Sequence, residues 1–300
     1  MAVRGRPSIG TRTFDIANYC FFFLVSITFI YPFWTIFVTS FEPIDGVYRL
    51  GLHIWPKQWR LESWRYVFDR ENVATAYLNT IYRVVVGTSF TLLVTFTGAY
   101  ALSKRDLPGR SVITTLYVLT LFFSGGLIPT YLLVRGLGLF NTRLAWILPT
   151  AINVYYIVIA RNFLMSIDQA MEDSAVIDGA SYWTVLMRII VPLSKPVIAV
   201  IALWAAVAHW NAWFDAMIYT PTRELRVLQL LVRDMITLLR TDILDRFTQD
   251  MLLQNVMIPR IPPEAVKAAT IILTIGPIIV VYPFIQKYFV KGVMLGSLKG

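Results

Sequence analysis

Two apolar runs of this sequence carry polar side chains four residues apart. Asn79 and Arg83 lie in one run, and Asn211 and Asp215 lie in another, next to Trp210. On a helix, a spacing of four places both members of a pair on the same face. Such groups could bind a carbohydrate, because aromatic rings pack against the C–H faces of sugars while amides and carboxylates bond to the hydroxyl groups. These five residues are therefore candidates for a substrate pathway.

Both pairs also have a structural interpretation, because interfaces between membrane helices use the same groups. Arg83 either pairs with an acid across a helix bundle or lines a wet cavity. Asp215, near the end of its run, either acts in a site or reaches out to water. Ionisable groups inside a membrane are costly, so a functional role is the first hypothesis for each of them.

The composition indicates an integral membrane protein. Of the 300 residues, 57% are hydrophobic and 15% are charged, whereas about a quarter of a soluble domain is charged. A net charge of +9 could point to nucleic acid, but the basic residues lie at the ends of apolar runs. That distribution indicates membrane anchoring, and we expect no nucleic-acid partner.

Six apolar runs are each long enough to cross about 30 Å of hydrocarbon as a helix of about 20 residues. The sequence therefore predicts an all-α membrane protein with an N-terminal segment, 1–15, and a single transmembrane domain, 16–300. Basic residues before the first run and in the short loop 104–110 indicate that both ends lie on the cytoplasmic side. The six spans are expected at about 16–41, 74–102, 112–134, 144–163, 197–219 and 268–289.

Several kinds of chemistry have no residues to carry them. A single cysteine, Cys20, and two distant histidines, His53 and His209, offer little for a metal site. The spans hold no plausible Ser/His/Asp set or pair of carboxylates, and the chain has no Gly-rich Lys-Ser/Thr loop for ATP phosphates. We expect a chain that is not an enzyme, binds no metal or cofactor, and takes any ATP-derived energy from another protein.

The polar stretch 166–196 has the pattern of two short helices joined by a glycine turn. Ser166 and Gln169 fit a capping box, and Gly179 can end the first helix with a positive φ. A second helix is expected from about Tyr182, before Pro192. Acidic residues near the first helix start suit the positive end of its dipole: Asp168, Glu172 and Asp173. The stretch is interpreted as a knob at the membrane surface that contacts a partner.

The same stretch resembles a cytoplasmic loop in the permease subunits of ABC importers, written EAA, three residues, Gly, nine residues, Ile, any residue, Leu-Pro. All of these spacings are kept here by Asp173-Ser174-Ala175, Gly179, Ile189 and Val191-Pro192. The resemblance implies contact with an ATPase, and either Glu172 or Asp173 could make its charged part. The residues implied in coupling are Glu172, Asp173, Ser174, Ala175, Asp178, Gly179 and Pro192.

Most of the chain is similar to the six-span permeases of maltose-type carbohydrate importers, of the type I fold. The segments 122–133, 210–219 and 287–300 resemble a branch serving larger oligosaccharides, including uronic-acid-containing chains such as alginate and xylan fragments. The resemblance implies a heterodimer with a second, similar permease in a bacterial inner membrane. It also implies an extracytoplasmic solute-binding protein and two cytoplasmic ATPase subunits, which would bind the ATP and Mg.

Two other classes compete with an ATP-driven importer. A stand-alone secondary sugar transporter would want coupling acids within its spans and inverted repeats, and a membrane enzyme would want a catalytic set. The segment 220–266 could also hold an amphipathic helix at 225–239. That helix would either offer a surface to an external partner or pack on the outer end of the bundle.

Overall fold

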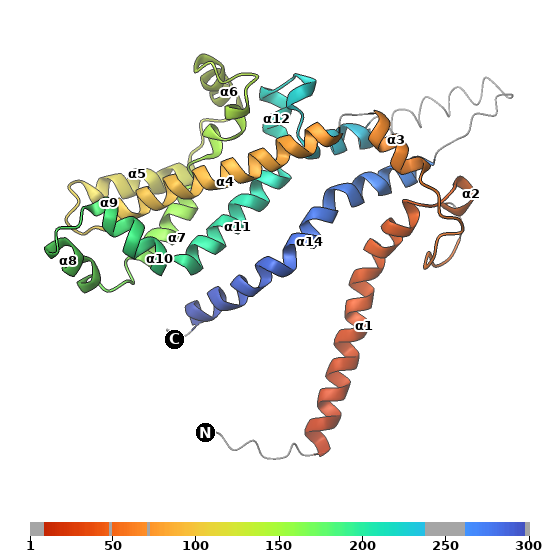
Figure 1. Ribbon diagram of the computed structural model, residues 1–300, viewed down its shortest axis with the longest axis horizontal. Coiled ribbons are helices and arrows are strands. Elements are labelled where there is room, and N and C mark those ends of the chain that lie inside the picture. Colours follow the sequence, from red (N-terminus) through yellow and green to blue (C-terminus); the bar gives the residue numbers. More distant parts are fainter. Residues whose placement is uncertain (1–8, 48–49, 71–72, 238–261, 298–300) are drawn as a thin grey trace. The chain divides into compact units, whose positions relative to one another are not determined.

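The computed structural model describes residues 9–47, 50–70, 73–237 and 262–297, with side chains of the last segment described to residue 280 (Figure 1). These residues are mainly helical and contain no strand. They form two compact units, one of residues 1–71 with 235–276 and one of residues 72–234 with 277–300. The all-α fold predicted from the sequence is confirmed.

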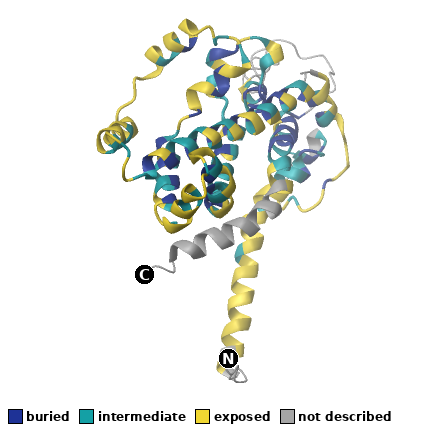
Figure 2. Cartoon of the chain, turned by 60° about the vertical axis from the view of Figure 1, so that its left-hand side comes forward, coloured by how far each residue is buried: buried dark blue, intermediate teal, exposed yellow. Residues whose placement is uncertain are grey.

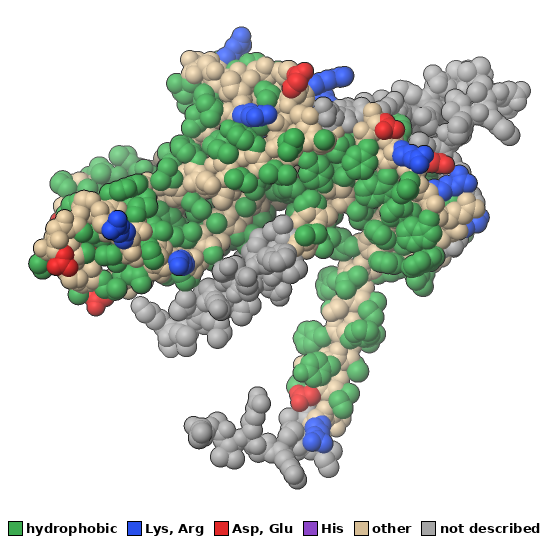
Figure 3. Space-filling model, viewed as in Figure 1, with side chains coloured by type: hydrophobic (Ala, Val, Ile, Leu, Met, Phe, Trp, Pro, Cys, Tyr) green, Lys and Arg blue, Asp and Glu red, His purple; other side chains and the backbone are tan. Residues whose placement is uncertain are grey.

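The first unit begins with α1, Ile9–Thr39. Its 31 residues would extend about 46 Å at 1.5 Å per residue, more than the thickness of a hydrocarbon core. Large apolar side chains along it are exposed, among them Phe14, Phe23 and Phe29. Figures 2 and 3 show an exposed, hydrophobic helix with charged side chains only at its beginning. Such a surface is suited to lipid or to another membrane chain.

Two short helices follow in this unit: α2, Ile44–Val47, and α3, Glu62–Arg70. Between ring centroids, Phe41 lies 5.1 Å from Trp59 and 5.8 Å from Trp64. Tryptophan is enriched where a membrane meets water, so this aromatic cluster suits the end of a span.

The second unit is built around α4, Val73–Ser103, which packs against α7, Val154–Leu164, and α11, Lys195–Asn211. Close packing is possible because α4 turns small or hydroxyl-bearing side chains inward, including Thr91, Thr95 and Ala99. Further elements whose bounds the structure describes are α5 (Arg110–Phe122), α6 (Leu127–Gly136), η1 (Arg143–Trp146), η2 (Leu148–Thr150), α8 (Ala170–Ile177), α9 (Tyr182–Val185), η3 (Leu186–Ile190), α10 (Val191–Leu193), α12 (Phe214–Tyr219) and η4 (Arg223–Leu225). The last helix of the chain is α14, Pro263–Ser297.

The apolar helices of the described residues can be set beside the six predicted spans, whose bounds stay predictions. Within the described residues, three single helices are long and apolar enough to cross a membrane: Arg12–Thr39, Val73–Ser103 and Pro263–Val280. Three bent pairs also qualify: α5 with α6, bent by 116°, η1–η2 with α7, by 52°, and the α9–α10 segment with α11, by 84°. Counting each pair as one span gives up to six, and the number six stays a prediction.

Three of the predicted spans are not continuous α-helices, and the one expected at 112–134 is divided into α5 and α6. The span expected at 144–163 begins as η1 and η2, and its α-helical part starts after Asn153, whose side chain caps α7. Pro149 lacks the N–H that an earlier α-helix would need. The span expected at 197–219 stops at Asn211, because Ala212 is extended, and α12 then begins at Phe214. Neither Gly nor Pro marks the break at Ala212, so hydropathy alone does not reveal it.

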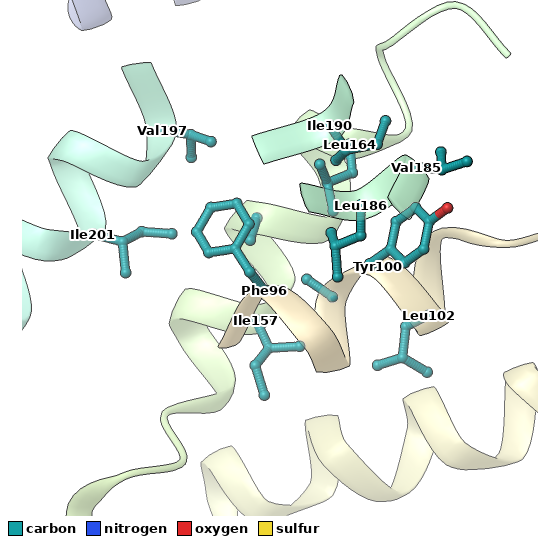
Figure 4. Packing of buried hydrophobic residues seen from close by; sticks show 12 residues of the cluster. Phe96, Tyr100, Leu102, Ile157, Leu164, Val185, Leu186, Ile190, Val197 and Ile201 are labelled. Atoms are coloured by element: carbon teal, nitrogen blue, oxygen red, sulfur yellow. The ribbon is translucent and has the colours of Figure 1, made fainter. Parts of the chain in front are cut away.

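A single buried cluster joins the stretch 166–196 to the long helices. Figure 4 shows Phe96 and Tyr100 of α4, with Ile157 and Leu164 of α7, pointing into this cluster. The second half of the stretch adds its own buried side chains: Val185, Leu186 and Ile190. Because protein interiors are close-packed, a displacement of this half must be felt by α4 and α7.

The predicted amphipathic segment is helical from 228 to 237, and the rest of the interval 225–239 beyond 237 lies outside the described residues. Val227 and Leu230 are buried against Trp146, Ile147 and Ala216. This packing favours the interpretation of a helix resting on the bundle over that of a surface for an external partner.

Candidate functional site

Arg83, in the middle of α4, forms a buried ion pair with Asp215. Its Nη1 donates to Asp215 Oδ1 over 2.9 Å, and its Nη2 donates to Oδ2. The side chains are 1% and 17% exposed. Two parallel hydrogen bonds of this kind are the strongest arrangement for an arginine and a carboxylate. The structure therefore shows Arg83 paired across the helices and corrects the alternative that Asp215 reaches out to water.

The pair also completes the break between α11 and α12. Arg83 Nη1 donates to the carbonyl of Ala212 over 3.2 Å, at the end of α11, where backbone carbonyls lack helical partners. Asp215 lies in the first turn of α12, where the helix dipole favours an acid. One guanidinium thus satisfies both sides of the break. The prediction that Asn211 and Asp215 share one helical face is wrong, because the helix stops between them.

A cavity of about 450 Å³ opens beside this pair. Its lining combines a cation, an acid, amide groups and an aromatic ring, and it includes Arg83, Asn153, Tyr156, His209, Asn211 and Asp215. This set could bond sugar hydroxyl groups and pack against a sugar ring. Arg83 therefore satisfies both earlier alternatives, because it pairs with an acid and also borders a cavity.

His209 marks a close approach of α11 to α4. The residue is 5% exposed, and a Cβ added at Gly87 would lie 2.6 Å from its Nε2. Only glycine leaves room for the imidazole at this point of α4. This close contact between His209 and Gly87 keeps α11 next to α4, and His209 forms part of the cavity wall beside Arg83.

Two of the five residues predicted for the substrate pathway lie elsewhere. Asn79 is 1% exposed, and its amide donates to the carbonyls of Glu224 and Arg226 over 2.7 and 2.9 Å. Its Oδ1 accepts from Arg143 over 3.2 Å. Trp210 stands edge-on to Tyr77, with ring centroids 6.5 Å apart. Neither side chain lines the cavity, and Asn79 instead fixes the loop after α12.

The turn at Gly179 has the geometry expected from the sequence, whereas the start of α8 does not. Gly179 has a φ of 83°, and the N–H groups of Gly179 and Ala180 donate to the carbonyls of Val176 and Ala175. These bonds form the Schellman motif that ends a helix. The predicted capping box is wrong, because Ser166 donates to the carbonyl of Phe163. Its place is taken by Asp168, whose carboxylate accepts from Ala170 N over 3.0 Å.

The two adjacent acids of α8 have different surroundings. Glu172 is paired with Lys104, just after α4, and accepts a hydrogen bond of 3.2 Å from the hydroxyl of Tyr100. The Lys104 amine also lies 4.3 Å from the centre of the Tyr100 ring. Burial lowers the pKa of Lys104, and the carboxylates of Asp106 and Asp173 oppose the shift. Asp173 itself is exposed and forms no ion pair within the described residues.

The outer face of the stretch 166–196 is exposed and mixed in character. Among the residues predicted for coupling, Asp173, Ser174, Asp178, Gly179 and Pro192 are exposed, whereas Ala175 and Glu172 are partly buried. Sequence reasoning missed three large apolar neighbours: Ile177, Tyr182 and Trp183 are 85%, 64% and 57% exposed. Exposed apolar groups beside acids are typical of a protein interface.

The sequence also failed to identify two residues of the cavity, Asn153 and Tyr156. Asn153 before an apolar run is a recognisable helix cap, and its Oδ1 does accept from Tyr156 N over 3.3 Å. That signal predicts the cap but not the cavity, which requires α7 and α11 to be placed together. Within the described residues, no group of three or more His, Cys, Asp or Glu side chains could hold a metal ion.

Long apolar helices, packed against a segment of two short helices joined by a turn at Gly179, are the architecture expected of a membrane transport subunit. The chain belongs to the permease subunits of carbohydrate ABC transporters. No family model matches the chain, and the assignment comes from individual relatives. This membership does not favour the secondary-transporter alternative.

Two curated relatives come from Bacillus subtilis strain 168. The protein LplC is 40% identical over 290 residues, which cover 96% of either chain. The polygalacturonan/rhamnogalacturonan transport system permease protein YtcP is 36% identical over 290 residues, covering 96% of this chain and 99% of the relative. Among solved structures, a bacterial ABC transporter involved in the import of the acidic polysaccharide alginate matches with a TM-score of 0.79. It is 31% identical and covers 95% of this chain and 99% of its own.

Proposed function

We propose that this chain is one of two transmembrane subunits of an importer that brings an acidic oligosaccharide into a bacterial cell. It would pair with a second, homologous permease and receive the sugar from an extracytoplasmic solute-binding protein. Two cytoplasmic subunits would bind and hydrolyse ATP with Mg. The chain itself would be non-catalytic and bind no cofactor.

The observation that carries the proposed sugar substrate is the cavity beside Arg83. Its lining offers Asn153, Asn211 and Tyr156 to hydroxyl groups and sugar faces, and the closed Arg83–Asp215 ion pair borders it. Two relatives support an acidic sugar, because one is named for polygalacturonan and rhamnogalacturonan and another is involved in alginate import. Of the predicted pathway residues, Arg83, Asn211 and Asp215 border this cavity, and we propose that they face the sugar's route.

The exposed face around Gly179 is the proposed contact with the ATPase. Asp173 and Asp178 are exposed acids that a basic partner group could meet, whereas Glu172 is already paired with Lys104. Val185 and Leu186 belong to the core that includes α4 and α7. Closure of the ATPase subunits on ATP would therefore move the knob together with these helices, and the cavity would alternate between the two sides of the membrane.

This role requires the knob, and with it both termini, to lie in the cytoplasm. A reporter that is active only outside the cell should fail when fused after Gly179 and work when fused after Arg60. An active reporter after Gly179 would overturn the proposed orientation.

Substrate class can be tested with the complete importer in vesicles. Uptake and ATP hydrolysis should be stimulated by oligogalacturonate or oligoalginate presented with the solute-binding protein, and less by neutral malto- or arabino-oligosaccharides of equal length. Asn211→Ala should raise the sugar concentration needed for half-maximal uptake, while Arg135→Ala, on exposed α6, should not. Equal stimulation by neutral chains would contradict the acidic class.

A further inference from the structure

Two arginines from different helices share one backbone acceptor near the end of α4. Arg110, at the start of α5, donates from Nε to the carbonyl of Leu102 over 3.0 Å. Arg161, in the last turn of α7, donates from Nε to the same oxygen over 2.9 Å. The two guanidinium groups are therefore immediate neighbours of like charge. Within the described residues, neither forms an ion pair with an acid.

Capping of α4 explains only part of this arrangement. A carbonyl in the last turn of a helix needs a donor, and basic groups suit that end of the dipole. Each guanidinium carries five N–H groups, of which Arg161 uses one here and Arg110 uses a second on Met165 Sδ over 3.4 Å. One arginine would satisfy the carbonyl. The second adds repulsion between like charges, which a bound anion would offset.

Both arginines line a cavity that could hold such an anion. Its volume is about 450 Å³, and its lining is Arg110, Ser111, Thr114, Thr115, Val118 and Arg161. The Thr114 hydroxyl is buried without a hydrogen-bond partner among the described residues. The cavity lies along the first turns of α5, where the helix dipole is positive. Two planar arginine forks and several hydroxyl groups suit a phosphate oxygen cluster.

We propose that this arginine pocket binds the phosphate headgroup of an anionic phospholipid. The apolar side chains of Leu121 and Phe122, three and four residues after Val118 and therefore on the same helical face, are exposed, and they offer a surface along which the acyl chains could lie. Basic pockets between membrane helices take anionic lipid headgroups on this physical basis. Bound lipid would join α5 to α7 at the end of the bundle nearest the knob. Lipid binding at this pocket does not depend on which sugar is carried.

The test uses the complete importer, purified in mild detergent and stripped of lipid. Phosphatidylglycerol should raise its thermal midpoint more than phosphatidylcholine of the same acyl chains, and native mass spectrometry should find phosphatidylglycerol retained. The double variant Arg110→Gln, Arg161→Gln should retain about tenfold less, as expected for the loss of charge-assisted hydrogen bonds. Arg135→Gln, on exposed α6, is the matched control and should retain the wild-type amount.

Three outcomes would overturn the inference. The first is equal retention by the double variant, and the second is equal stabilisation of the wild type by phosphatidylcholine. The third is full protection of the wild type by inorganic phosphate, which would make the site one for a free anion. If the double variant does not assemble, Arg161→Lys keeps the charge without the planar fork. It should retain several-fold less phosphatidylglycerol, and unchanged retention would reject the pocket.

Discussion

Two ion pairs, one within α4 and one just after its end, differ in burial and in the segments that they connect. Arg83, within the helix, is 1% exposed and meets Asp215 at a helix break, whereas Lys104, just beyond the helix, is 25% exposed and meets Glu172 of the knob. The first pair is closed in by packing and by the carbonyl of Ala212. The second is supported by one hydroxyl group at 3.2 Å.

This difference separates a fixed element from one that can move. Breaking a buried pair strands a charge in a poorly solvated place, so the helix break at Ala212, which Arg83 completes, should persist while the transporter works. A partly exposed pair can exchange its partner for water at small cost. The Lys104–Glu172 ion pair is therefore the contact that can adjust when the ATPase subunits close, while the second half of the knob stays packed against α4 and α7.

The largest effect is expected from Arg83→Leu. Asp215 would be left unpaired and largely buried, and removal of one partner of such a pair costs about 3–5 kcal/mol. The Ala212 carbonyl would lose its donor as well. Membrane insertion should remain normal, while the thermal midpoint and the yield of assembled importer should fall sharply.

A second substitution distinguishes the stranded charge from a general packing defect. Arg83→Leu combined with Asp215→Leu removes both charges and should recover much of the stability, although not transport. Arg135→Leu, which changes an exposed arginine on α6, serves as control for the substitution itself. Wild-type assembly of the single Arg83→Leu variant would show that the pair is not a structural anchor.

Much of the fold follows from the sequence because hydropathy and length decide where helices can lie in a membrane. The helix predicted at 74–102 differs from α4 by one residue at either end. The break between α5 and α6 can be expected from the sequence Ser124-Gly125-Gly126, because glycine readily adopts the positive φ of 83° that Gly126 has here. The break at Ala212 is not, since it depends on a guanidinium from another helix, which leaves no signature in the local sequence.

The candidate site is predictable residue by residue but not as an arrangement. Arg83 and Asp215 stand out because charges are rare in apolar runs, and the structure brings them together. Asn79 stands out for the same reason, yet its bonds go to the loop at Glu224. Which of two polar side chains faces a cavity depends on helix packing, and a single sequence does not contain that information.

An intermediate effect, confined to coupling, is expected from Gly179→Asp. A side chain at φ 83° costs about 1–2 kcal/mol of local strain, but a Cβ there meets no atom of the chain within 4 Å. The permease should therefore fold and assemble with its partner permease. The added carboxylate would occupy the proposed ATPase contact, so sugar and loaded binding protein should no longer stimulate ATP hydrolysis.

Gly138→Asp provides a matched control for this strain. Gly138 has a φ of 69°, and a Cβ there would also meet open space, but the residue lies just after α6 and outside the knob. Its ATPase stimulation should match the wild type. If Gly179→Asp and Gly138→Asp behave alike, strain rather than docking explains the result.

The smallest and most selective effect should come from comparing Glu172→Gln with Asp173→Asn. Glu172→Gln removes the charge that meets Lys104, and the partly exposed pair should lose about 1 kcal/mol. A double-mutant cycle with Lys104→Gln should recover that interaction energy, because the two side chains contact each other directly.

Asp173→Asn should leave the stability of the permease unchanged, since Asp173 is exposed, and should reduce the amount of ATPase that co-purifies. The opposite pattern, with stability lost in Asp173→Asn and ATPase lost only in Glu172→Gln, would show that the acid held by Lys104 leaves α4 to dock on the partner. The pair would then be a contact that is exchanged in each transport cycle, instead of a brace that lasts through it.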